Sequence, residues 1–340
     1  MSSPVRVVVA DDSAFMRRLL TEALEKHGFD VVAAVGDGDR ALAACVELRP
    51  DVLSLDLTMP GLDGIGVLRG LRQTDLGISV VVVSAFSPAH GAHAVDALAE
   101  GAVELVAKPA GGEDLEEFVA DLGSKVRLAA GSRRRLPPSS VQNAAVSATP
   151  RRGRARMVLI ACSTGGPQAL TELLPRLPSP LGAGTVIVQH MPAGFTGSLA
   201  ARLDNTSPLE VREAQAGDRL DPRTALVAPG GRHLRILADR RAKLADDAPI
   251  GGLRPRADLT IADIAHSFGS DVLLVVLTGM GKDGLEGARE VRRRGGRILA
   301  EAESSCTVYG MPRAIVEAGL ADGVHDLGRL PDVIAREAAA

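Results

Sequence analysis

Short apolar runs alternate with amphipathic segments along the first part of the chain. The apolar runs cover residues 5–10, 31–35, 52–55, 80–83 and 103–107. Apolar runs of strand length that alternate with helical patterns are typical of βα units, in which helices cover both faces of a parallel sheet. This part of the sequence therefore predicts an α/β domain of flavodoxin-like (βα)5 type.

Polar side chains stand where these predicted strands end. Asp11 and Asp12 follow the first strand, Asp56 follows the third, Ser84 the fourth and Lys108 the fifth. In a doubly wound sheet these positions meet at the carboxyl edge, where ligands bind. Three carboxylates repel one another there, and a divalent cation such as Mg²⁺ relieves the repulsion. The pattern predicts a cation site that can stabilise a phosphoryl group on an aspartate, with carboxylates that merely cap helices as the alternative.

The second part of the chain repeats the α/β pattern. Predicted strands cover residues 157–161, 185–188, 225–228, 272–277 and 297–300, and helical patterns cover residues 261–267 and 287–294. Residues 209–249 are richer in Gly, Pro and short β-like runs such as residues 233–237, which indicates a hairpin outside the main sheet. We expect a second domain with a doubly wound parallel sheet.

The first strand of this second domain ends in a cluster of small polar residues around Ser163. Residues 157–167 read MVLIACSTGGP, which is typical of a strand, a tight turn and the start of a helix. This arrangement would place the Ser163 hydroxyl beside free N–H groups at a helix N-terminus, where negative charge is stabilised. On this stretch alone, a nucleophile and a phosphate-binding or purely structural glycine turn remain equally possible.

Two other predicted strand ends carry residues that complement a serine nucleophile. His190 follows the strand in TVIVQHMP, and Asp283 lies in the glycine-rich loop after the strand in VLLVVLTGMGKDG. Taken alone, His190 would be a buried core histidine and Asp283 a loop-capping residue. Because all three residues stand at carboxyl ends of predicted parallel strands, the set predicts a Ser-His-Asp triad.

Composition supports two soluble domains and excludes some functions. The 340 residues suffice for two cores, and an aromatic content of 2% with no Trp makes base stacking an improbable mode of ligand recognition. Cys45, Cys162 and Cys306 are odd in number and widely spaced, which predicts free thiols. No apolar run reaches the length of a membrane span and no signal-peptide pattern is present, so we expect a cytoplasmic protein.

A basic segment separates the two predicted domains. Residues 126–156 contain no acidic residue but repeated arginines, prolines and serines, without hydrophobic periodicity. This composition predicts a linker, with a nucleic-acid-binding arm as the alternative. The expected boundaries are residues 1–124 for the first domain, 125–155 for the linker and 156–340 for the second domain.

The first domain resembles the response-regulator receiver domain. The segments VVVADDSAFMRRLL, DVLSLDLTMPGLDG, VVVVSAF and ELVAKP match the motifs of that family in order and spacing. The resemblance implies that Asp56 is the phosphoacceptor and that Asp11, Asp12 and Asp56 hold Mg²⁺. It further implies that Ser84 is the switch hydroxyl and that Lys108 pairs with the phosphoryl oxygens.

The second domain resembles the catalytic domain of chemotaxis protein-glutamate methylesterases. The segments that match this family are ACSTGGP, QHMPAGFTGSLAARL, VAPGGRHL, LTGMGKDG and CTVYGMP. The resemblance implies that Ser163 is the nucleophile, His190 the general base and Asp283 its orienting partner. The backbone N–H groups at Thr164 and Met280 are candidates for the oxyanion hole, and neither a metal nor an organic cofactor is expected at this site.

Together the two resemblances imply a hydrolase that is activated by phosphorylation. Its substrates would be glutamyl methyl esters, and in many members glutamines, of methyl-accepting chemotaxis receptors, and its phosphodonor would be the chemotaxis histidine kinase. We expect the unphosphorylated receiver to cover the catalytic cleft, and an association with receptor arrays without membrane insertion or nucleic-acid binding. A DNA-binding response regulator and a catalytically silent receptor-docking module are the alternatives.

The sequence departs from both family patterns at a few positions. Leu105 stands where receivers usually carry an aromatic residue, which puts the rotating-aromatic part of the switch in doubt. Ala161 and Cys162 precede the nucleophile where Gly and Ala are usual. Leu253 and Arg256 replace a His and a Ser around an Arg-Pro pair near the expected cleft. We expect Leu253 and Arg256 to affect receptor preference or reaction rate, but not the type of reaction.

Overall fold

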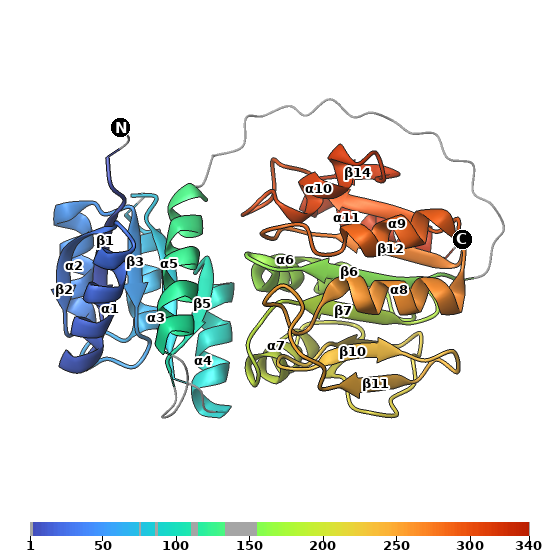
Figure 1. The fold of residues 1–340 in the computed structure, drawn as a ribbon, viewed down its shortest axis with the longest axis horizontal. Helices are drawn as coiled ribbons and strands as arrows, with labels where there is room; N and C mark the ends of the chain where they lie inside the picture. The colour runs from blue at the N-terminus through green and yellow to red at the C-terminus, as the bar shows by residue number, and fades with distance from the viewer. Residues whose placement is uncertain (1–2, 75, 86–87, 110–114, 133–154, 340) are drawn as a thin grey trace. The chain divides into compact units, whose positions relative to one another are not determined.

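The computed structural model describes residues 3–74, 76–85, 88–109, 115–132 and 155–339 (Figure 1). The chain divides into two compact units, Met1–Arg134 and Arg135–Ala340. Most of the basic segment between the predicted domains, including its arginine clusters up to residue 154, lies outside the described residues. In the described part of the chain, no helix is long and apolar enough to cross a membrane.

The first unit contains a five-stranded parallel sheet. The strands are β1 (Arg6–Ala10), β2 (Asp30–Val35), β3 (Val52–Leu55), β4 (Ser79–Ser84) and β5 (Glu104–Ala107). The helices are α1 (Ala14–Lys26), α2 (Gly38–Leu48), α3 (Gly64–Arg72), α4 (Pro88–Ala99) and α5 (Leu115–Gly131). The strand order β2-β1-β3-β4-β5 is that of flavodoxin-like folds, which confirms the predicted fold class.

Helix α5 extends further than the sequence analysis predicted. It packs beside α1 over one face of the sheet, where Leu122, Val126 and Ala129 join a core cluster with Leu20 and Leu24 of α1. This apolar face continues the helix to Gly131, so residues 125–131 of the expected linker are helical. The prediction placed the start of the linker too early, because the apolar face of the helix continues through Val126 and Ala129.

The second unit contains a seven-stranded parallel sheet in the order β14-β13-β12-β6-β7-β9-β8. Its strands are β6 (Met157–Cys162), β7 (Thr185–Gln189), β8 (Glu210–Glu213), β9 (Thr224–Val227), β12 (Val272–Val276), β13 (Arg297–Glu301) and β14 (Gly323–His325). The expected hairpin is present as the antiparallel pair β10 (His233–Ile236) and β11 (Ala242–Ala245).

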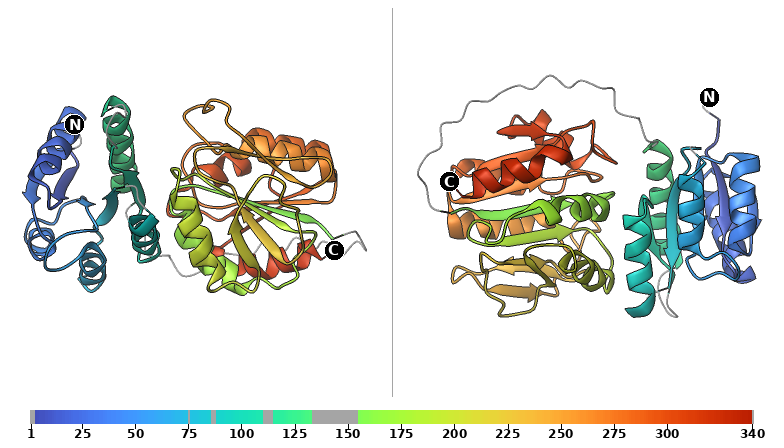
Figure 2. Two further views of the ribbon diagram at one scale, coloured as in Figure 1. Left: turned by 90° about the horizontal axis from the view of Figure 1, so that it is seen from below. Right: turned by 180° about the vertical axis from the view of Figure 1, so that it is seen from behind.

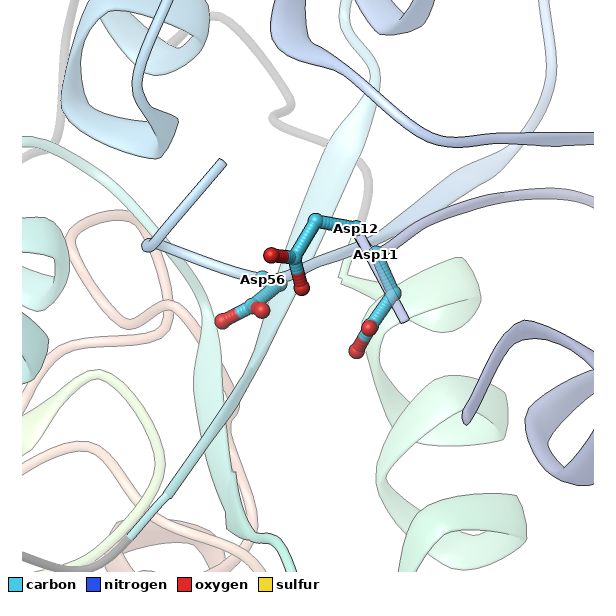
Figure 3. A group of neighbouring side chains, drawn as sticks. All are labelled: Asp11, Asp12 and Asp56. Atoms are coloured by element: carbon cyan, nitrogen blue, oxygen red, sulfur yellow. The ribbon is translucent and has the colours of Figure 1, made fainter. Parts of the chain in front are cut away.

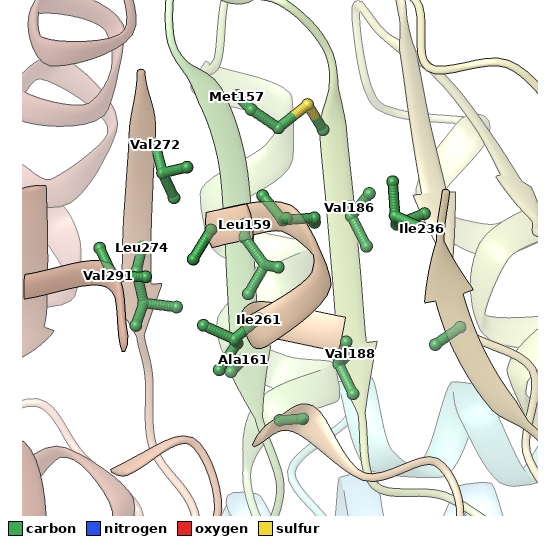
Figure 4. Packing of buried hydrophobic residues seen from close by; sticks show 14 of the residues in the cluster. Met157, Leu159, Ala161, Val186, Val188, Ile236, Ile261, Val272, Leu274 and Val291 are labelled. Atoms are coloured by element: carbon green, nitrogen blue, oxygen red, sulfur yellow. The ribbon is translucent and has the colours of Figure 1, made fainter. Parts of the chain in front are cut away.

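Helices cover both faces of this sheet, as predicted (Figure 2). They are α6 (Gly166–Leu173), α7 (Phe195–Asp204), α8 (Ala257–Phe268), α9 (Leu285–Arg293), α10 (Met311–Glu317) and α11 (Leu330–Ala338), with short 3-10 turns η1 (Leu174–Arg176) and η2 (Leu327–Arg329). On one face, alternate residues of β6 such as Leu159 pack against Ile261 of α8 and Val291 of α9 (Figure 4).

Strand β6 lies at the point where the order of the sheet reverses. The chain passes from β6 to β7 on one side of the sheet and later returns to β12 on the other side. Open parallel sheets bind ligands outside the carboxyl ends of the strands at such a switch point. A ligand or active site is therefore expected at the loops that follow β6, β7 and β12.

Candidate active site and phosphoacceptor site

Ser163 occupies the turn between β6 and α6. Its backbone N–H donates to the carbonyl of Thr278 at 3.0 Å, and its own carbonyl accepts from the N–H of Gly166 at 2.8 Å. Gly165 has a φ of +76°, and a Cβ there would lie 2.4 Å from Thr307 Oγ1, so the turn needs glycine at this position. The tight turn leaves the Ser163 side chain half-buried at the end of the strand.

The register of the sheet brings His190 next to this turn. Cys162 pairs with Gln189 across β6 and β7, and the N–H of His190 donates to the Cys162 carbonyl at 3.1 Å. Ser163 and His190 therefore follow the last paired positions of adjacent parallel strands, which lie about 4.8 Å apart. Sequence alone placed both residues at strand ends, and the structure makes those strands neighbours.

Asp283 in the loop after β12 binds the His190 imidazole. Nε2 of His190 lies 2.8 Å from Asp283 Oδ2, and both side chains are buried. Backbone N–H groups of Ala257, Asp258 and Gly284 also donate to the Asp283 carboxylate, at 2.7, 3.0 and 2.9 Å. Burial alone would raise the pKa of Asp283, but the hydrogen bond to His190, its charge and the backbone donors hold that pKa well below its usual range. The carboxylate stays ionised, and Nδ1 is the remaining imidazole nitrogen that can accept a proton.

Gln189 joins the turns that carry Ser163 and His190, a role that the sequence analysis missed. Its Nε2 donates to the carbonyls of Ser163 and His190, each at 2.9 Å. A Cβ on Gly166 would lie 1.9 Å from Gln189 Oε1, so glycine at 166 makes room for this side chain. A polar residue at the last position of an otherwise apolar strand was the available signal.

A second buried network lies under the Ser163 turn. The N–H of Thr278 donates to Glu301 Oε2 at 2.7 Å, and the Thr278 hydroxyl donates to the carbonyl of Thr164 at 2.9 Å. Burial raises the pKa of Glu301. Because the Thr278 carbonyl also accepts from Ser163 N–H, these contacts fix the backbone on both sides of the serine.

The residues beside Ser163 differ in their surroundings. Ala161 and Cys162 are fully buried, and burial, followed by the negative charge of Glu301, raises the pKa of the Cys162 thiol. A buried, protonated thiol is a poor nucleophile. Of the two oxyanion-hole candidates, Thr164 is buried in the turn, whereas Met280 is 51% exposed in the loop after β12.

The first unit brings three carboxylates together at its own carboxyl edge. One oxygen from each of Asp11, Asp12 and Asp56 lies within 4.8 Å of the others (Figure 3). Lys108 Nζ lies 2.7 Å from both Asp11 Oδ2 and Asp56 Oδ2. Burial is the main cause that raises the pKa of Asp11, with the charge of Asp56 adding to it. An oxygen-only donor set with surplus negative charge fits a hard divalent cation such as Mg²⁺.

Ser84 and Leu105 lie on the strands next to this carboxylate cluster. Ser84 ends β4 opposite Ala107 of β5, and its carbonyl accepts from Lys108 N–H at 2.8 Å. Leu105 is 2% exposed within β5. The backbone of Ser84, the predicted switch residue, is thus bonded to that of Lys108, and Leu105, at the position of the usual aromatic residue, is part of the core.

The folds and sites define a class of protein: a response regulator whose output domain is a doubly wound α/β domain with Ser, His and Asp at one edge of its sheet. Family models agree for both units. The response regulator receiver domain matches residues 7–120, and the CheB methylesterase matches residues 158–334. The chain belongs to the CheB methylesterase family.

Individual relatives cover nearly the whole chain. A Symbiobacterium thermophilum protein named protein-glutamate methylesterase/protein-glutamine glutaminase is 43% identical over 98% of this chain and 97% of its own length. A Myxococcus xanthus protein with the same name, numbered 5, is 46% identical over 94% of each chain. The crystal structure of the Thermotoga maritima CheB methylesterase catalytic domain is 41% identical, with a TM-score of 0.52, and covers 54% of this chain and 98% of that one.

Proposed function

We propose that this protein hydrolyses glutamyl methyl esters on methyl-accepting chemotaxis receptors and also deamidates receptor glutamines. The observation that carries the proposal is the buried His190–Asp283 pair, in which His190 directly follows the strand next to that of Ser163. The names of the full-length relatives supply the ester and the amide as substrates. Both reactions replace a leaving group on the same side-chain carbonyl carbon, so one nucleophile can serve both.

In the proposed reaction, Ser163 Oγ attacks the ester carbonyl carbon while His190 Nδ1 takes the hydroxyl proton. Backbone N–H groups at Thr164 and Met280 stabilise the negative oxygen of the tetrahedral intermediate. The intermediate collapses, and methanol leaves with the proton from His190. Water then attacks the acyl-serine with His190 again as the base, which releases the glutamate carboxylate. Asp283 stabilises the imidazolium in both halves of the reaction.

The receiver domain regulates this activity in our proposal. Asp56 accepts a phosphoryl group from a chemotaxis histidine kinase, and phosphorylation shifts the protein toward a more active state. Asp11, Asp12 and Asp56 would hold Mg²⁺, which supplies positive charge for the transferred group. Lys108 pairs with the phosphoryl oxygens, and the Ser84 hydroxyl responds to them. We place the protein in the cytoplasm, peripheral to the receptor arrays.

Methanol release from methylated receptor membranes tests both parts of the proposal, with and without a small-molecule phosphodonor. Ser163→Ala removes the nucleophile and should abolish release, whereas Ser270→Ala changes an exposed serine and serves as the matched control. Asp56→Asn should release methanol without any response to the phosphodonor. Full activity of Ser163→Ala would overturn the nucleophile assignment, and a wild-type response of Asp56→Asn would overturn the regulation.

A silent docking module and a DNA-binding regulator make different predictions. A silent module would release no methanol in the wild-type protein. A DNA-binding regulator would shift a duplex in a gel assay, and the parallel sheet of the second unit offers no helix-turn-helix for this among the described residues. The same protein preparation can be used for both measurements.

A further inference from the structure

The side chain of Arg256, just before helix α8, contacts the aspartate that binds His190. Arg256 Nε lies 3.3 Å from Asp283 Oδ1, and Nη2 lies 2.9 Å from Asp258 Oδ2. Nη1 donates to the carbonyl of Ile250 at 2.9 Å. The guanidinium group therefore bridges two carboxylates, and one of these is the proposed partner of the catalytic base.

Backbone groups already hold Asp283 in place without this side chain. Asp283 accepts from the N–H groups of Ala257 and Asp258 at the start of α8. Asp258 Oδ1 in turn accepts from the N–H groups of Gly284 and Gly287 at the start of α9, each at 2.9 Å. The two aspartates thus cap each other's helices. What Arg256 adds to this arrangement is mainly charge.

Charged and titratable side chains from three elements meet at Asp283. His190 approaches from the end of β7, Arg256 from the residue before α8, and Asp258 from the first turn of α8. His233 of β10 accepts from the backbone N–H of Arg256 at 3.2 Å. Burial, and then the charge of Asp283, raise the pKa of Asp258, so a nearby cation is needed to keep both carboxylates ionised.

We propose that Arg256 is a positioning residue for the catalytic base: by sharing the Asp283 carboxylate, its charge sets the position of the acid limb in the pH profile of the hydrolysis. The physical reason is competition for one anion. The negative charge of Asp283 stabilises the imidazolium form of His190, and a cation close to Asp283 weakens that stabilisation. Asp258 acts in the opposite direction, because its negative charge favours the imidazolium. The two side chains together set the pH range in which the base can accept a proton.

The inference rests on the proposed ester hydrolysis, and its test uses the full chain with saturating phosphodonor. The measured quantity is the acid limb, which is the pH at which kcat/KM for methanol release falls on the acidic side of its pH profile. This pH reports the protonation of the essential base in the free enzyme. Arg256→Gln removes the charge and should move the limb up by about half a pH unit. Asp258→Asn keeps the Oδ1 acceptor for Gly284 and Gly287 and should move the limb down by about the same amount.

Two further variants separate charge from structure. Arg256→Lys keeps the charge and should restore the wild-type limb. The double variant Arg256→Gln/Asp258→Asn removes one charge of each sign and should return the limb close to that of the wild type. A structural role alone would lower activity at every pH and leave the limb in place.

The proposal is overturned if the limb stays fixed in both single variants or moves in the same direction in both. If Arg256→Gln fails to fold, as judged by circular dichroism, Asp258→Asn still decides through the sign of its shift. Failure of the underlying function would look different: the wild type would release no methanol, or Ser163→Ala would release it at the wild-type rate.

Discussion

Both units place aspartates at the carboxyl edge of a parallel sheet, but they compensate the negative charge to different extents. In the second unit, Asp283 accepts from three backbone N–H groups and from His190, and Arg256 also contacts its carboxylate. In the first unit, Lys108 provides the cation for Asp11 and Asp56 together. The arrangement around Asp283 in the second unit is complete within the protein, whereas the carboxylate cluster of the first unit retains negative charge for an added ligand.

The pKa directions follow this difference. The pKa of Asp283 is lowered, so its ionised form stabilises the folded state above a pH of about 4, and this stability is lost as the pH falls further. The pKa of Asp11 is raised, so folding is most favourable while Asp11 is protonated, and ionisation reduces stability as the pH rises. Neutralising each aspartate should therefore have opposite effects on stability.

The largest effect is expected for Asp283→Asn. In either orientation, the new amide group would turn a donor toward groups that require an acceptor: Ala257 N–H and the His190 ring at one oxygen, or the N–H groups of Asp258 and Gly284 at the other. By analogy with the same change in serine hydrolases, we expect kcat to fall by about 10⁴-fold. The melting temperature of the second unit should fall as well, because buried donors lose their acceptor.

Methanol release and calorimetry measure both consequences of Asp283→Asn. Asp239→Asn at an exposed position of the same unit is the matched control. Activity within tenfold of the wild type would show that Asp283 does not orient the base. Phosphorylation of Asp56 should be unaffected, because the change lies in the other unit.

An intermediate effect is expected for Gln189→Glu. The amide Nε2 donates to two carbonyls, and a carboxylate oxygen in its place would face both of them without a proton to share. A penalty of about 1–3 kcal/mol for a mismatched buried polar group corresponds to a loss of roughly 5- to 150-fold in kcat.

Gln189→Met is the control for this prediction. It removes the donor without adding charge, and Ser163 carbonyl keeps its bond from Gly166 N–H. We expect Gln189→Met to be less impaired than Gln189→Glu in methanol release. Equal activity of both variants and the wild type would show that Gln189 does not couple the two turns.

The sequence predicted the buried strands well and missed the short edge strands. Fully buried strands such as β3 and β6 are uninterrupted apolar runs, which the pattern identifies directly. By contrast, β8 reads EVRE and β14 reads GVH, so neither carries an apolar signal. These strands exist because a neighbouring strand offers hydrogen-bonding groups, and that neighbour becomes known only once the sheet order is known.

The same limit applies to the candidate site. Ser163, His190 and Asp283 could be proposed from sequence because each follows an apolar strand. The bridging contacts of Gln189 and Arg256 depend on register and on loop placement, which join residues far apart in the chain. The sequence marked Arg256 only as a departure from a motif, and the structure places it against Asp283.

Asp11→Asn, for which we expect the smallest effect, tests the carboxylate cluster of the first unit. The Oδ1 acceptor for Ser13 N–H is kept, while a buried negative charge beside Asp56 is removed. Without Mg²⁺ at neutral pH, the melting temperature of the receiver should rise by roughly 1–3 °C. The gain should disappear as the pH falls and wild-type Asp11 becomes protonated.

Saturating Mg²⁺ should make the wild type the more stable of the two proteins, because the wild type keeps all three carboxylates for the cation. A lower melting temperature for the variant without Mg²⁺ would mean that the ion pair with Lys108 outweighs the burial of Asp11, and the contrast between the two sites would fail.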